Sequence, residues 1–293
     1  MKLRTMLETI TSQLGTTACA IPLSSCRPAK SYLLERAGIP LTGTAVLFAV
    51  PYLVTADAAE AADPLRNLSL YAVSKDYHGY MQALSQEILP VLRTIFPKQI
   101  FALFADHSPI CEVDAAARAG LGVLGANGLL ITPDFGSFVF LGEIVTDAPY
   151  EVVVGAEPPA FPDEPPLCEG CGACLRACPA GCGVGGDRKA CLSALTQKKG
   201  TLSPEEMEAI GRNGLAWGCD TCQLVCPHNR RVIREGRDTP IPYFREDRIL
   251  HLDTEALDAM NDEDFSARAY AWRGRGVIRR NVVFLQNLER NKP

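Results

Sequence analysis

The chain has 293 residues, of which 47% are hydrophobic and 22% are charged, as is usual for a protein with a substantial buried core. Its net charge of −5 excludes a protein whose whole surface binds nucleic acid, although it allows a local basic groove. No apolar run reaches the roughly 18 residues of a membrane span. Polar residues at 8–13 interrupt any apolar leader, so we expect no secretory signal and a cytoplasmic location.

Residues 1–38 predict two helical pieces separated by a break rich in Thr, Ser and Pro. Cys19 and Cys26 lie in this break. We interpret them as small, half-buried thiols, the commoner role of an isolated cysteine, in preference to metal ligands.

The next part of the chain predicts alternating strands and helices. Apolar side chains recur at helical spacing over residues 81–96 and end before Pro97, which predicts a long amphipathic helix. A shorter helix is expected at 115–120. Short apolar runs predict strands at residues 44–50, 100–104, 138–145 and 150–154.

Asp106 directly follows one of these strands. A carboxyl group that a buried strand carries into an apolar site can keep its proton near neutral pH, because desolvation disfavours the charged form. Asp106 is therefore a candidate acid, and the alternative is that it caps the helix after Pro109. His78 has a similar choice between a capping or core hydrogen bond and a ligand role.

The segment 120–128 is rich in glycine. Glycine allows close approach of the backbone, so this loop can cradle a flat or phosphorylated ligand. The pattern equally fits a tight structural turn, because it is not a G-x-G-x-x-G sequence that opens a helix.

A proline-rich stretch at residues 157–166 predicts a stiff linker. We therefore expect a first domain at 1–156 and a cysteine-rich module at 167–230. Residues 231–293 are expected to form a C-terminal segment that packs back on the first domain.

The cysteine-rich module carries two related motifs. The first is C-x2-C-x2-C-x3-C-P, which in bacterial ferredoxins gives three thiolates to one [4Fe–4S] cluster and the fourth to another. The second is C-x2-C-x3-C-P, and Cys191 supplies the cysteine that it lacks. This pattern predicts one cluster on Cys168, Cys171, Cys174 and Cys226, and a second on Cys191, Cys219, Cys222 and Cys178.

Zinc is the alternative metal for paired C-x2-C motifs, but zinc sites do not require this spacing. Cys182 is left over from the two predicted ligand sets, and we interpret it as a packing residue. A free-standing ferredoxin needs only the module, so the preceding domain implies a second redox centre or a substrate.

Several blocks resemble the epoxyqueuosine reductase family in sequence and in order: residues 106–112, 119–127, 136–147, 218–227 and 272–274. The resemblance implies an α+β fold with a nitroreductase-like, cobalamin-binding domain followed by a ferredoxin-like double [4Fe–4S] domain. It also implies an oxidoreductase that converts epoxyqueuosine in tRNA to queuosine, with electrons passing from the clusters to cobalamin. The reductive dehalogenases are a more distant relation.

The resemblance assigns roles to individual residues. Asp106 matches the proton donor of the family. Residues that fall where the family contacts the corrin, mainly through the backbone, are Asn127, Leu130, Thr132, Leu141, Gly142, Ser193 and Thr196. The chain departs from the family at Val123, Ala126 and His228, where Trp, Lys and Trp are usual.

The last segment is basic, and it can either hold phosphates of the tRNA anticodon region or form the solvated face of a helix. Its basic residues are Arg268, Arg273, Arg275, Arg279, Arg280, Arg290 and Lys292. The expected partners are tRNA and an external electron donor such as a flavodoxin or a ferredoxin.

Two other functions remain open from the sequence. The first is a cobalamin and iron–sulfur reductase of a small molecule such as an organohalide or another epoxide. The second is an electron-transfer protein whose first domain holds no cobalamin.

Overall fold

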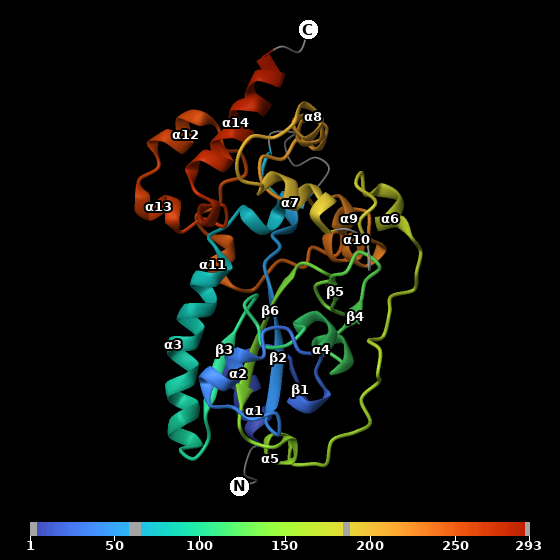
Figure 1. Cartoon of the computed structure of the whole chain (residues 1–293), viewed down its shortest axis with the longest axis vertical. Coiled ribbons are helices and arrows are strands. Elements are labelled where there is room, and N and C mark those ends of the chain that lie inside the picture. Colours follow the sequence, from blue (N-terminus) through green and yellow to red (C-terminus); the bar gives the residue numbers. More distant parts are fainter. Residues whose placement is uncertain (1–4, 59–65, 184–187, 291–293) are drawn as a thin grey trace. The chain divides into compact units, whose positions relative to one another are not determined.

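The structure is a computed structural model that describes residues 5–58, 66–183 and 188–290 (Figure 1). The chain forms two compact units. Unit 1 comprises residues 1–51, 78–125 and 129–170, and unit 2 comprises residues 52–77, 126–128 and 171–293. Unit 2 thus includes two stretches from the part expected to be the first domain, so the domain boundaries given above stay a prediction.

Unit 1 is built on a four-stranded antiparallel sheet in the order β1-β2-β6-β3. Every residue of β2 is buried, which explains why its sequence is a continuous apolar run. The strands are β1 (Ala18–Pro22), β2 (Thr44–Pro51), β3 (Phe101–Phe104) and β6 (Val139–Thr146). The predicted strands at 44–50, 100–104 and 138–145 are therefore confirmed.

Two predictions for unit 1 are wrong. Residues 18–22, expected between two helices, form β1, because all five of them pair with residues 44–48 of β2. Residues 150–154, expected to be a strand, form the helix α5 (Tyr150–Val154). Pro149 precedes α5 and Gly155 ends it in a left-handed conformation, so the local turn chemistry overrides the β preference of three valines.

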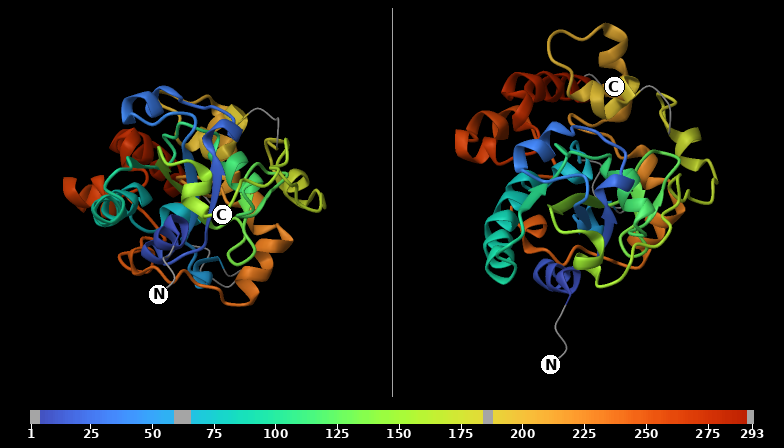
Figure 2. Two further views of the ribbon diagram at one scale, coloured as in Figure 1. Left: turned by 90° about the horizontal axis from the view of Figure 1, so that it is seen from below. Right: turned by 60° about the horizontal axis from the view of Figure 1, so that its bottom comes forward.

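The helices of unit 1 alternate with these strands along the chain. The long helix predicted at 81–96 is confirmed as α3, which begins four residues earlier. The short helix expected at 115–120 is observed as α4, at residues 112–118. In Figure 2, α1 lies beside the N-terminus and packs against α5. The helices are α1 (Met6–Leu14), α2 (Tyr32–Ala37), α3 (Tyr77–Ile95) and α4 (Glu112–Arg118).

The core of unit 1 forms where α4 packs on β2 and β6. Ala115, Ala116 and Ala117 of α4 are buried, and their small side chains allow the helix to lie close to the sheet. The two-stranded ribbon of β4 (Val123–Leu124) and β5 (Leu130–Ile131) borders this core.

Unit 2 is mainly helical. Its core centres on Trp217 and Tyr270, whose rings meet edge to face with centroids 6.3 Å apart. Helices α8 and α12 both pack against α14. The helices are α6 (Ala173–Ala177), α7 (Leu192–Thr196), α8 (Pro204–Asn213), α9 (Thr221–Leu224), α10 (Pro227–Arg234), α11 (Pro242–Arg245), α12 (Thr254–Ala259), α13 (Asp262–Ser266) and α14 (Arg275–Arg290).

Helix α8 begins as its sequence predicts. The Ser203 side chain accepts a hydrogen bond from the N–H of Glu206, whose carboxylate accepts one from the N–H of Ser203. Pro204 is the first helical residue, where its missing N–H costs no hydrogen bond. None of the helices in the described residues is long and apolar enough to cross a membrane.

A substitution at Gly142 of β6 tests how tightly the core of unit 1 is packed. A Cβ atom added at Gly142 would lie 2.4 Å from a ring carbon of Phe48. We expect Gly142→Ala to lower the free energy of unfolding by about 1–3 kcal/mol, because the buried Phe48 ring must move.

The measurement is urea denaturation, with Gly276→Ala in α14 as the control. An added Cβ at Gly276 meets no atom within 4 Å, so this helical substitution should be neutral or stabilising by up to about 1 kcal/mol. Equal stability of Gly142→Ala and the unmodified protein would contradict the packing argument.

Candidate functional site

Four cysteines of unit 2 face one another. The pKa of Cys222 is raised to about 12, mainly by burial and in smaller part by the negative charges of Cys219, Cys191 and Cys178. Cys191 likewise raises the pKa of Cys219, although burial is the larger cause. These four thiols are the set that the spacing predicts for one [4Fe–4S] cluster.

A cavity of about 640 Å³ lies beside this set. The neighbours of three predicted ligands line it: Ala177 and Pro179 beside Cys178, Ala190 and Leu192 beside Cys191, and Thr221 beside Cys222. The residues that line this cavity do not include the thiols themselves, so the fit to a cubane cluster rests on the grouped thiols, whose negative charges iron would offset.

Cys182 belongs to the same group of thiols. Burial raises its pKa to about 11, with further contributions from the charges of Cys191 and Cys178 and from hydrogen bonds with both. The sequence places Cys182 only four residues after Cys178, and spacing alone did not reveal that it points toward the predicted ligands. We call Cys178, Cys182, Cys191, Cys219 and Cys222 the thiol group of unit 2.

The other predicted ligand set is divided between the units. Cys171, Cys174 and Cys226 are in unit 2, where α6 packs against α9 and Cys226 is buried at the start of α10. Cys168 is in unit 1, and its N–H donates to the carbonyl of Leu124 at 3.0 Å.

Among the described residues, no three His, Cys, Asp or Glu side chains are arranged to hold a single metal ion. Structural zinc sites need four ligands around one ion, whereas a cubane separates its thiolates around a larger body.

A buried ion pair holds the second cysteine motif in unit 2. Asp220, between Cys219 and Thr221, is 1% exposed. Its carboxylate accepts from Nη1 of Arg66 at 2.5 Å and from the N–H of Leu70 at 3.0 Å. The charge is thus paired and hydrogen-bonded, as a buried carboxylate requires.

Gly218 shows why the motif begins with glycine. Its φ of +78° is left-handed, and an added Cβ would lie 2.5 Å from Cβ of Ser69. The N–H of Gly218 donates to Oγ1 of Thr196 at 2.9 Å. Buried Asn281 of α14 donates to the carbonyls of Thr196 and Ala216, so one amide ties α7 to the segment before the motif.

The predicted corrin contacts in unit 2 have other partners. The hydroxyl of fully buried Thr196 donates to the carbonyl of Ser193 and accepts from Gly218. Oγ of Ser193 accepts from the Gln197 amide. The Asn127 side chain hydrogen-bonds the Cys222 thiol. This bond lowers the pKa of Cys222 and so partly offsets the effect of burial.

The predicted corrin contacts in unit 1 lie in or beside its core. Leu130 is buried and Leu141 packs against the same core cluster. The Thr132 hydroxyl donates to the carbonyl of Gly136 within a turn. Gly142 is the residue packed beneath Phe48. These side chains stabilise the fold, so a corrin would contact the backbone of these residues.

Asp106 differs from expectation. The side chain is 66% exposed, so the burial argument for a retained proton does not apply to it. The reason is local: β3 ends at Phe104, and Asp106 has a left-handed φ of 63° that turns the chain. Nε2 of His78 lies 3.9 Å from Oδ2 of Asp106.

Two carboxyls that the sequence did not single out carry the effects expected at Asp106. Burial raises the pKa of Glu112 to about 7, and the charge of Asp106 adds to this. Burial raises the pKa of Glu143 to about 8. A glutamate in the middle of an apolar strand was the available signal for Glu143.

Comparison with known proteins gives three findings. Residues 167–229 match the model of a 4Fe–4S double cluster binding domain. An epoxyqueuosine reductase of Listeria monocytogenes is 34% identical over 232 residues, which cover 72% of this chain and 54% of that protein. The structure of epoxyqueuosine reductase from Streptococcus thermophilus has a TM-score of 0.74 at 22% identity, covering 98% of this chain and 81% of that one.

The chain is similar to epoxyqueuosine reductases. An epoxyqueuosine reductase bound to an epoxyqueuosine-modified tRNA stem loop also has this fold, with a TM-score of 0.68 at 23% identity, covering 95% of this chain and 79% of that one. The predicted resemblance, the mixed helix-and-sheet fold and the double [4Fe–4S] domain are confirmed. The chain spans about half the length of the curated relatives that it matches.

Cys191 provides a direct test of the ligand sets. We expect anaerobically reconstituted protein to contain about eight iron atoms per chain, and Cys191→Ala to contain about four, because one cluster loses a ligand. The measurement is iron and sulfide content together with the visible spectrum.

Cys19→Ala in β1 is the matched control and should retain the full iron content. Full iron content in Cys191→Ala would overturn the proposed set and point to Cys182 as the ligand.

Proposed function

We propose that the chain is a cobalamin- and iron–sulfur-dependent oxidoreductase that converts epoxyqueuosine in tRNA to queuosine. The observation that carries the proposal is the 34% identity with an epoxyqueuosine reductase over 232 residues. The double-cluster domain matched at residues 167–229 provides the kind of redox centre that the reaction needs. A cytoplasmic location is proposed with it, because tRNA is the substrate.

Conversion of an epoxide to an alkene consumes two electrons and two protons and releases water. Bound cobalamin supplies the reducing centre, and the clusters supply its electrons one at a time. The side chains of the predicted corrin contacts pack in the core or hydrogen-bond within the protein, so these residues are proposed to hold cobalamin through their backbones. They are Asn127, Leu130, Thr132, Leu141, Gly142, Ser193 and Thr196.

Asp106 is the residue proposed to protonate the departing oxygen. Its carboxyl is open to solvent, so it can exchange protons with water before the substrate binds. The His78 ring lies beside this carboxyl, with Nε2 3.9 Å from Oδ2 of Asp106. The left-handed conformation at Asp106 is the kind of strained backbone that is concentrated at functional sites.

The basic C-terminal segment is used largely within unit 2. Arg268 pairs with Asp247, and Arg279 with Asp258. Arg275 and Arg280 donate to backbone carbonyls. Lys292 lies outside the described residues.

The tRNA contact is therefore proposed at Arg273, whose guanidinium lies 3.7 Å from the ring centroid of Trp272. Trp272 is 58% exposed. An exposed aromatic ring beside a cation can stack on a base while the cation meets a phosphate. A flavodoxin or a ferredoxin is the proposed electron donor.

The reaction itself is tested with tRNA from cells in which queuosine synthesis stops at the epoxide. We expect the reduced, cobalamin-loaded protein to convert the epoxyqueuosine of this tRNA to queuosine, detected after digestion to nucleosides. Unchanged epoxyqueuosine would contradict the proposal and favour a small-molecule substrate. If added cobalamin shows no spectral shift on mixing with the protein, the electron-transfer function is favoured instead.

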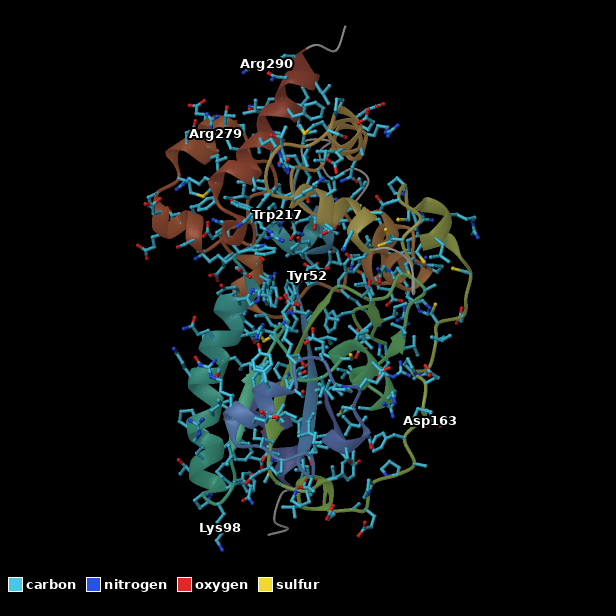
Figure 3. All side chains as sticks on the ribbon, viewed as in Figure 1. Tyr52, Lys98, Asp163, Trp217, Arg279 and Arg290 are labelled. Carbon is cyan, nitrogen blue, oxygen red and sulfur yellow. The ribbon has the colours of Figure 1, made fainter. Side chains whose placement is uncertain are left out.

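Asp106→Asn tests the proton donor. Asparagine keeps the shape but cannot donate a proton from a carboxyl, so turnover should fall by about 100-fold or more. Iron content and the cobalamin spectrum should not change. Asp163→Asn, in the proline-rich segment labelled in Figure 3, is the matched control. Turnover of Asp106→Asn at the rate of this control would return Asp106 to a structural role.

A further inference from the structure

The backbone at Asp106 forms a strained turn. The N–H of His107 donates to the carbonyl of Ala105 at 2.6 Å, across the positive φ of Asp106. A three-residue turn of this hand is rare and costs free energy in a residue other than glycine. Such a turn persists only if neighbouring groups hold it.

Glu112 holds the central residue of this turn. Its Oε2 accepts a hydrogen bond from the N–H of Asp106 at 3.3 Å. Glu112 is the first residue of α4, and α4 packs on β2 and β6. The acceptor is therefore fixed by the core of unit 1.

His107, the next residue, is bound through both ring nitrogens. Nδ1 lies 2.9 Å from Nζ of Lys30, and Nε2 lies 2.9 Å from the hydroxyl of Tyr32. An ammonium group can only donate, so Nδ1 accepts and the ring proton is on Nε2. His107 thus ties the turn to Lys30 and to Tyr32, the first residue of α2.

Ser108 is bound to Glu143 of β6. Its Oγ lies 2.8 Å from the carbonyl oxygen of Ile110 and 2.5 Å from Oε1 of Glu143. One hydroxyl proton cannot serve two acceptors, but both bonds form if Glu143 is protonated and donates to Oγ. Within the described residues, Oε2 of Glu143 is buried without a hydrogen-bond partner, which also favours the neutral form.

We propose that Glu112 is a positioning residue for Asp106: its carboxylate holds Asp106 in the left-handed turn, and protonation of Glu112 weakens that hold. The proposal rests on the proposed function in so far as Asp106 is the proton donor. A hydrogen bond to a charged carboxylate is roughly twice as strong as one to a neutral group, so the charge of Glu112 determines how firmly the turn is held.

The pH at which this change occurs is near neutrality. The pKa of Glu112 is raised to about 7: burial, the largest cause, and the charge of Asp106 raise it, and the Asp106 N–H and Lys30 partly offset them. Glu112 is therefore ionised above about pH 7 and protonated below it. Glu143 faces it from β6, where burial raises the pKa to about 8, and His78 faces Asp106 from α3.

The hydrogen bond between the Asp106 N–H and Glu112 is followed by NMR, without a turnover assay. In the full chain with its clusters, labelled with isotopic aspartate, the NMR shift of the Asp106 amide proton should change with an inflection near pH 7. Glu112→Gln retains an acceptor oxygen but does not titrate, so its Asp106 amide should show no inflection there. The same inflection in Glu112→Gln would overturn the proposal.

The pH–rate profile then tests the effect on catalysis. Glu112→Ala should lower kcat by about 10- to 100-fold with an unchanged KM for tRNA, because the acid is misplaced while binding is intact. Glu112→Gln should restore most of kcat and remove the bend near pH 7. Equal losses in both variants, with the bend retained, would show a merely structural role.

Glu151→Gln is the matched control, because Glu151 is also a first-turn glutamate of a short helix in unit 1 and is exposed. It should behave as the unmodified protein in both measurements. If the unmodified protein fails to convert epoxyqueuosine, the proposed function is wrong, and the amide titration still decides whether Glu112 holds the turn.

Discussion

The buried ion pair of Arg66 and Asp220 is the interaction on which unit 2 depends most. It fixes the loop between Cys219 and Cys222, and it brings the stretch around Leu70 to that loop through a backbone N–H. Removing either charged partner would leave the other buried and unpaired, at a cost of about 3–5 kcal/mol. The pair therefore links the geometry of two cysteines to a segment about 150 residues earlier in the chain. Trp217, which is labelled in Figure 3 and lies three residues before Asp220, packs edge to face with Tyr270 in the core of unit 2.

Much of the architecture could be predicted because its signals are local. The continuous apolar run of β2, the cap and proline that start α8 and the spacing of the cysteines each depend on neighbours in sequence. β1 could not be predicted, because only its pairing with β2 makes residues 18–22 a strand. The roles of Asn281, Glu112 and Glu143 were missed for the same reason. Each depends on a partner that the fold brings from another element.

The candidate acid shows how a correct chemical principle can be assigned to the wrong atom. Desolvation was expected to act on Asp106 because a buried strand precedes it. The strand ends at Phe104 as predicted, but only its first residue is fully buried, and the turn that follows it exposes the Asp106 side chain. Desolvation acts instead on Glu112 and Glu143, and it raises the pKa of both carboxyl groups. The protein thus separates the exposed carboxyl of Asp106 from the half-buried carboxyl of Glu112 and the fully buried carboxyl of Glu143.

The thiol group of unit 2 has a consequence for how the protein responds to oxygen. It contains five cysteines, and disulfides consume thiols in pairs. If the iron is lost, complete pairing within the group is impossible, and one thiol remains to attack another molecule. Oxidation would then yield crosslinked chains as well as internal disulfides. Exclusion of air before the iron is in place therefore protects the chain from covalent aggregation as much as it protects the cluster.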